Sequence, residues 1–205
     1  MCPRVSDEHK ERRRQAILDA AMEVFLGRGY QVATINDISS ECGMSVGAIY
    51  RYFRNKGEIM LTLVEERLGR TPELFARLTE TAGDPWERLD RCVDLFTSAL
   101  RVRHPATGRL LLVTMAEAVQ DGEVRRGLHN RFSALVTYLE GIIKDGVAVG
   151  LFRPDVDAVA LAAVLMSAAD GVAVYWVTGA PEIEPRIMRS TMLAMLRAYL
   201  IIEKE

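Results

Sequence analysis

The chain has 205 residues, which is enough for one large domain or two modest ones. Apolar residues make up 49% of it and the formal net charge is −2, which excludes a globally disordered chain and a polycation. The three cysteines are widely spaced and lack CxxC spacing, which argues against a disulfide framework and a metal site. The sequence has no N-terminal apolar run and no apolar stretch long enough to span a bilayer, which argues against a secretory signal and a membrane span. Together these observations favour a cytoplasmic protein.

The predicted elements are all helices, because apolar residues recur at spacings of three and four and no alternating strand pattern occurs. A first helix is predicted at about 10–28. A second opens at Thr34, whose hydroxyl can cap the backbone, and Asp37 three residues later completes a capping-box pattern. Gly43 lies where the chain has to turn sharply, and Ser45 can cap a short third helix. This order of signals is typical of a helix-turn-helix.

The remaining helices form a longer body. A fourth helix is predicted from about 56 to 79, after the cap-and-acid pattern of Asn55 and Glu58. Asp84 and Pro85 suit a helix start, and the helices that follow are predicted at about 84–103, 108–119, 121–149, 155–178 and 183–203. The predicted fold class is therefore all-α with about nine helices: a three-helix head at 1–55 and a helical body at 56–205, with the helix at 56–79 connecting them.

The third helix carries the residues that we expect to enter DNA. In helix-turn-helix proteins the second helix of the pair lies in the major groove, and its N-terminal residues reach base edges. Here those residues are small, so the helix end can approach the groove closely. Val46 or Ala48 could contact a thymine methyl, and Ser45 could donate to a phosphate or a base. Gly47 completes this small-residue helix start.

Phosphate-seeking side chains follow directly. Tyr50 and Tyr52 flank Arg51, and Lys56 lies at the start of the fourth helix. Hydroxyls, a guanidinium, an ammonium and free helix N–H groups all suit phosphate oxygens, and Thr34 sits at another helix N-terminus. The competing interpretation is an ordinary helical hairpin with Tyr50 as a core aromatic. The combination of caps, turn glycine and cations favours the DNA-binding interpretation.

Residues about 12–60 resemble the DNA-binding domain of the TetR family of transcriptional regulators. The matching residues are Ile17-Leu-Asp-Ala-Ala, Phe25, Gly29-Tyr30, Ala33-Thr34-Ile35, Ile38 through Gly43, Ser45 through Phe53, and Asn55-Lys56. The resemblance implies DNA-backbone contacts by Thr34, Ser45, Gly47, Tyr50, Tyr52 and Lys56. It also implies that Val46 and Arg51 can approach bases. Val46 departs from the polar residue that many members carry there, so any readout at this position would be hydrophobic.

The same stretch contains a motif of another class. Gly43-Met44-Ser45-Val46-Gly47 satisfies G-x-S-x-G, the nucleophile elbow of α/β-hydrolases. That motif requires a strand before the serine, whereas the residues before Ser45 are predicted to be helical. A serine hydrolase acting through Ser45 is therefore a remote alternative, and we expect no enzyme activity.

The resemblance implies that the body is a ligand-binding and dimerisation domain. Large, adaptable or polar residues there could line a largely apolar pocket, although ordinary core packing is the alternative for each of them. The candidates are Phe96, Met115, His129, Phe132, Tyr138 and Trp176. The helices at about 155–178 and 183–203 are the candidates for a homodimer interface, because the first is apolar nearly all round and rich in small residues, and the second has a wide apolar stripe. An internal core helix is the alternative.

These observations predict a cytoplasmic, homodimeric regulator that binds double-stranded DNA. We expect a repressor of an inverted-repeat operator that is released by an unknown small-molecule effector, without cofactor, metal or membrane. An activator, or a regulator without a ligand, fits the head equally well. The fourth helix is expected to be the only continuous link between body and head.

Overall fold

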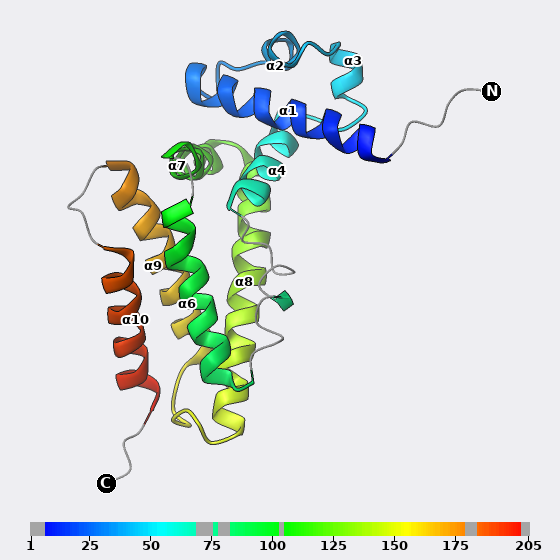
Figure 1. Cartoon of the computed structure of the whole chain (residues 1–205). Coiled ribbons are helices and arrows are strands. Elements are labelled where there is room, and N and C mark those ends of the chain that lie inside the picture. The colour runs from blue at the N-terminus through cyan, green and yellow to red at the C-terminus, as the bar shows by residue number, and fades with distance from the viewer. Residues whose placement is uncertain (1–6, 69–75, 78–82, 103–104, 179–183, 202–205) are drawn as a thin grey trace. The chain divides into compact units, whose positions relative to one another are not determined.

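A computed structural model describes residues 7–68, 76–77, 83–102, 105–178 and 184–201 (Figure 1). These residues form nine helices and no strand, which confirms the predicted all-α class with a helix-turn-helix head. The helices are α1 Asp7–Arg28, α2 Ile35–Cys42, α3 Val46–Ile49, α4 Lys56–Leu68, α6 Pro85–Val102, α7 Pro105–Gln120, α8 Gly122–Ala148, α9 Ala158–Thr178 and α10 Pro185–Leu200. The predicted end of the fourth helix, near residue 79, lies outside the described residues.

Contacts between Cα atoms divide the chain into two compact units. Of the described residues, 7–67 and 109–128 belong to the first unit, and the others belong to the second. The first unit thus combines α1–α4 with most of α7 and the first two turns of α8. Helix α8 is continuous and passes from the first unit into the second. The expectation that the fourth helix links a head at 1–55 to a body at 56–205 stays a prediction.

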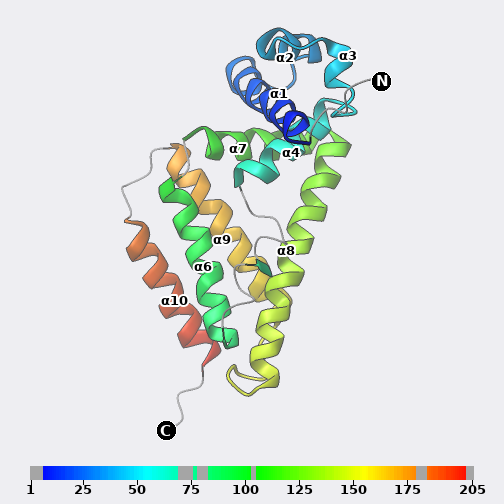
Figure 2. The ribbon, with the colours of Figure 1, turned by 45° about the vertical axis from the view of Figure 1, so that its right-hand side comes forward.

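The core of the first unit lies on one face of α1. Ile17, Leu18 and Phe25 of α1 are fully buried, as are Ile38 of α2 and Ile49 of α3. Burying a side chain of this size stabilises the fold by roughly 1.5–3 kcal/mol. Figure 2 shows α2 and α3 following α1 in this unit, joined by tight turns. The apolar face of α1 is therefore the platform on which the helix-turn-helix is held.

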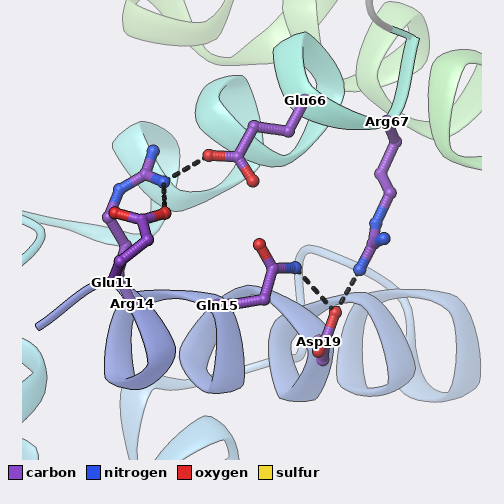
Figure 3. Close-up of polar contacts among 6 residues, drawn as sticks. All are labelled: Glu11, Arg14, Gln15, Asp19, Glu66 and Arg67. Carbon is purple, nitrogen blue, oxygen red and sulfur yellow. Dashed lines mark hydrogen bonds and ion pairs between the residues drawn. The ribbon is translucent and has the colours of Figure 1, made fainter. Parts of the chain in front are cut away.

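Polar contacts also fix α1 to α4 (Figure 3). Arg14 pairs with Glu66, and Arg67 pairs with Asp19, so each helix supplies one cation and one carboxylate. Gln15 Nε2 also donates to Asp19 Oδ1 at 3.0 Å. Exposed ion pairs contribute little individually, but these two are reciprocal and set the register between the helices.

The second unit has its own core between α6, α8, α9 and α10. Fully buried members include Leu89 and Val93 of α6, Leu139 and Ile142 of α8, and Leu200 of α10. Figure 2 shows α6, α9 and α10 running side by side. No helix among the described residues is both long and apolar enough to cross a membrane.

Three predicted helix starts differ from the structure by three residues, of which the first is α1, which begins at Asp7 rather than near 10. Helix α7 begins at Pro105 rather than near 108, because proline is tolerated at the first helical position, where its missing N–H has no intrahelical partner. Helix α9 begins at Ala158 rather than 155, because the Asp157 carboxylate accepts from Ala160 N at 2.9 Å and caps the helix there.

Candidate DNA-binding surface

The turn between α2 and α3 is built from local signals. Thr34 is the N-cap of α2: its Oγ1 accepts from Asp37 N at 3.2 Å, and Asp37 Oδ2 accepts from Thr34 N at 2.9 Å. Gly43 ends α2 with φ +66°, in the left-handed region that favours glycine. Ser45 then caps α3 by accepting from Ala48 N at 3.3 Å. The predicted capping box, turn glycine and third-helix cap are confirmed.

The serine of the G-x-S-x-G sequence is thus a helix cap. The residues before the motif form α2, whereas a nucleophile elbow needs a strand there. Ser45 Oγ accepts a backbone hydrogen bond inside its own helix start. The remote hydrolase alternative has no strand at this position to support it.

Helix α3 buries one side and leaves the other open. Ile49 and Phe53 are buried in the core, whereas Ser45, Gly47 and Arg51 are exposed. Val46 and Ala48 are half-buried at the border between the two sides. The small residues at the start of α3 therefore lie at an open surface, as a helix that enters a groove requires.

The fold of the protein does not require a glycine at position 47. Its φ is not positive, and a Cβ built on it would meet no heavy atom within 4 Å beyond the adjoining residues and the helix backbone. Glycine in a helix costs roughly 0.5–1 kcal/mol relative to alanine. A glycine retained without conformational or packing need is typical of a position that something outside the chain approaches closely.

Tyr50, Arg51 and Tyr52 continue the open surface. Tyr50 is 53% exposed, so the interpretation of this residue as a core aromatic is wrong. Tyr52 is half-buried. Within the described part of the chain, the exposed Arg51 guanidinium makes no hydrogen bond or ion pair, whereas Arg28 and Arg54 pair with carboxylates. Arg51 is therefore a cation that is available to an anionic partner.

Thr34 and Lys56, the other predicted phosphate contacts, already have intramolecular partners. Thr34 Oγ1 also donates to Asp37 Oδ2 at 2.6 Å, and hydrogen bonds from Thr34 hold the pKa of Asp37 below its usual value. Lys56 Nζ donates to the carbonyl oxygens of Tyr30, Gln31 and Ala33 at 2.6, 3.3 and 2.9 Å. It also lies 4.3 Å from the centre of the Tyr30 ring, and partial burial lowers its pKa. A phosphate contact by Lys56 stays a prediction, because a direct hydrogen bond would have to replace one of these carbonyls.

Comparison with protein families shows to which family the chain belongs. Residues 17–63 match the family model of bacterial regulatory proteins of the tetR family, and residues 85–201 match the C-terminal domain of BetI-type transcriptional repressors. The chain belongs to the TetR family. It is accordingly a DNA-binding transcriptional regulator, and members of this family bind DNA and ligands and are typically dimeric.

Relatives and solved structures of TetR-family and other regulators cover nearly the whole chain. The fatty acid metabolism regulator protein of Bacillus subtilis is 25% identical over 88% of this chain and 91% of its own length. The structure of FadR from Bacillus subtilis with stearoyl-CoA matches with a TM-score of 0.74 at 24% identity, covering 89% of this chain and 96% of that one. A regulator from Saccharomonospora viridis with choline matches with a TM-score of 0.73 at 24% identity, covering 94% and 100%. The structural likenesses concern the fold.

The predicted ligand residues fall into different places. Phe96 is buried in the core of the second unit, and Phe132 and Tyr138 pack against that core. Met115 belongs to the first unit, His129 is exposed, and the side chain of Trp176 lies outside those that the structure describes. The second unit therefore brings together three of the six candidates: Phe96, Phe132 and Tyr138.

Sequence analysis missed several charged residues. Arg131 of α8 is buried in the second unit, although charged side chains are rarely buried, and no pattern around it marks it in the sequence. In the first unit, Glu117 of α7, Asp121 before α8 and Glu123 of α8 contact the segments on either side of the helix-turn-helix. Asp121 is recognisable as a cap, since its Oδ1 accepts from Glu123 N at 2.8 Å, but its contact with the head has no local signal.

Proposed function

We propose that this TetR-family regulator is a repressor that binds an inverted-repeat operator as a homodimer and is released by a small-molecule effector. The observation that carries the proposal is the open side of α3, where small residues lie at the start of a capped helix and the unpaired, exposed Arg51 follows its end. In this proposal Ser45, Gly47, Tyr50 and Tyr52 contact the DNA backbone. Val46, Ala48 and Arg51 reach base edges.

Repression is favoured over activation by the body of the chain. More than half of the sequence matches the C-terminal domain of a repressor family. A protein that occupies promoter DNA needs no contact with polymerase in order to repress, so the DNA-binding surface and a release mechanism are sufficient. Thr34 and Lys56 are proposed to add phosphate contacts through their positions at helix starts.

Dimerisation is proposed through α9 and α10. Val164 of α9 is 62% exposed and Met195 of α10 is 67% exposed, and both lie among further exposed apolar residues. These are Val159, Val174, Tyr175, Ile187 and Tyr199. Apolar surface of this kind on two neighbouring helices is typical of a protein interface, and a second copy is the partner that the family makes most natural. A two-fold dimer would read two half-sites roughly 34–36 Å apart or somewhat more.

Release requires an effector that binds one conformation better than the other. Ligands with equal affinity for the DNA-bound and released states shift nothing. The apolar core around Phe96, Phe132 and Tyr138 is the proposed location of the effector site. Stearoyl-CoA and choline are bound to two structures of the same fold, so thioesters and quaternary amines are the first compounds to test.

Selection of duplexes from a randomised pool tests the proposal. The expected product is an inverted repeat that binds two chains, and an effector should raise the melting temperature of the free protein and weaken this complex. Val164→Glu should produce monomers with weak operator binding, whereas Val149→Glu, at an exposed valine outside α9 and α10, should leave the dimer intact. An enriched sequence without symmetry, or a dimer that survives Val164→Glu, would contradict the dimeric mode. Stimulation of transcription in vitro from a promoter with this site would identify an activator.

A further inference from the structure

Three carboxylates of the α7–α8 junction contact the segments that flank the helix-turn-helix. We call Glu117, Asp121 and Glu123 the acidic corner. Glu117 accepts from the Gln31 side-chain amide, and Asp121 Oδ2 accepts from Tyr30 Oη at 3.5 Å. The two carboxylate oxygens of Glu123 accept from Asn55 Nδ2 at 3.2 and 3.0 Å. All of these residues belong to the first unit.

The contacted residues lie at both ends of the DNA-reading segment. Tyr30 and Gln31 lie in the turn that leads from α1 to α2. Asn55 follows the turn after α3, and its Oδ1 accepts from Glu58 N at 2.8 Å, which caps α4. Lys56 joins these ends, since it is adjacent to Asn55 and donates to the carbonyls of Tyr30 and Gln31. The acidic corner therefore closes a network around the helix-turn-helix.

Close packing supports the same contact independently. A Cβ at Gly127, in the second turn of α8, would lie 2.4, 2.5 and 3.0 Å from Cδ1, Cδ2 and Cγ of Leu61 in α4. Real Cβ contacts are not this short, so a side chain at residue 127 would require the Leu61 side chain of α4 to move. Gly141, later in the same helix, has no such neighbour.

The charge of the acidic corner is unfavourable for DNA binding. Three carboxylates in the DNA-binding unit repel a polyanion, and neutralising any of them should strengthen DNA binding if charge were their only effect. Their hydrogen bonds act in the opposite direction, since charge-assisted bonds to side-chain amides are among the stronger ones. If neutralising one of these carboxylates weakens DNA binding, its role is positioning. If neutralisation strengthens DNA binding, its effect is electrostatic.

We propose that Glu117, Asp121 and Glu123 are positioning residues that hold the DNA-reading segment in its binding geometry. The inference rests on the proposed DNA-binding function. It assigns part of operator affinity to residues outside the matched DNA-binding region at 17–63, none of which contacts DNA in this mechanism.

Glu123→Gln is the central variant. It removes the charge and one of the two acceptors of Asn55, so operator affinity should fall about ten-fold, with an unchanged slope of log affinity against log salt concentration. Asn55→Asp alone should also weaken binding, because two carboxylates then face each other. The double variant Asn55→Asp/Glu123→Gln restores the bond with reversed polarity at the wild-type net charge, and should recover the lost affinity. Glu65→Gln, at an exposed carboxylate of α4, is the charge control. Tighter binding by both Glu123→Gln and Glu65→Gln would overturn the proposal.

Gly127→Ala provides a test that leaves every charge in place. The added methyl should force the Leu61 side chain of α4 to repack against α8 and weaken operator binding, whereas Gly141→Ala should bind as wild type. Hydrogen exchange of the free protein supplies a readout that needs no DNA: amides of residues 29–34 and 54–58 should exchange faster in Glu123→Gln than in wild type. Unchanged exchange would refute the hold even if no operator is found. Faster exchange in a protein that binds no DNA would refute the proposed function alone.

Discussion

Gly47→Ala should make the protein more stable and a poorer DNA binder. The added methyl has open space within the chain, and no positive φ opposes it. Replacing glycine by alanine in a helix is worth up to about 1 kcal/mol, or a rise of roughly 2–4 °C in melting temperature for a chain of this size. On DNA the same methyl stands between the start of α3 and the backbone. Loss of one charge-assisted hydrogen bond there would weaken binding by about 1.5–3 kcal/mol, which is at least ten-fold.

The measurement pairs thermal unfolding with fluorescence anisotropy on the selected duplex. Gly27→Ala is the matched control, because Gly27 is an exposed helical glycine of α1 with equally open space around its Cβ. It should give a similar gain in stability with unchanged DNA affinity. Wild-type affinity in Gly47→Ala would refute the close approach of α3 to DNA. A loss of stability would refute the assignment of open space around residue 47.

Substitutions at three other residues test separate parts of the structure. Arg51→Ala should weaken binding by roughly 1–3 kcal/mol at particular base pairs of an operator library, whereas a uniform loss would reassign Arg51 to the DNA backbone. Gly146→Ala should cost about 1–3 kcal/mol of unfolding free energy in chemical denaturation, because its Cβ would lie 2.1 Å from Cδ2 of Phe152; an unchanged midpoint would contradict the tight packing. Lys56→Arg should destabilise the protein yet keep the salt dependence of DNA binding, whereas Lys56→Met should lower the slope by about one. Equal slopes for both Lys56 variants would exclude a phosphate interaction at this residue.

Local signals made the head predictable from the sequence. The Thr34–Asp37 capping box, the left-handed Gly43 and the Ser45 cap each involve residues within three or four positions, so their energetics are visible in the residue order. The helix starts at α7 and α9 were less predictable. Pro105 is compatible with both a break and a first helical position, and Asp155 and Asp157 are both of a residue type that caps helices.

Contacts between distant residues were not predictable in the same way. Gln31 and Glu117 are 86 positions apart, and Asn55 and Glu123 are 68 apart, so no local spacing relates them. The grouping of the candidate pocket residues has the same limit. Met115 and Phe96 are both large apolar residues on neighbouring helices, but they belong to different compact units. Periodicity identifies which face of a helix is apolar, but not which helix will cover it.

Lys56 uses its hydrogen-bond donors within the protein but keeps its positive charge. Its three carbonyl partners occupy the ammonium donors, but carbonyl dipoles carry no net charge and leave the residue cationic. A phosphate near the start of α4 would still be attracted, without a direct hydrogen bond. An arginine keeps that charge, but its planar fork cannot reach three converging carbonyls as a compact ammonium does. The residue that resembles a phosphate ligand in the sequence therefore also has a structural role, because it fastens the turn before α2 to the start of α4.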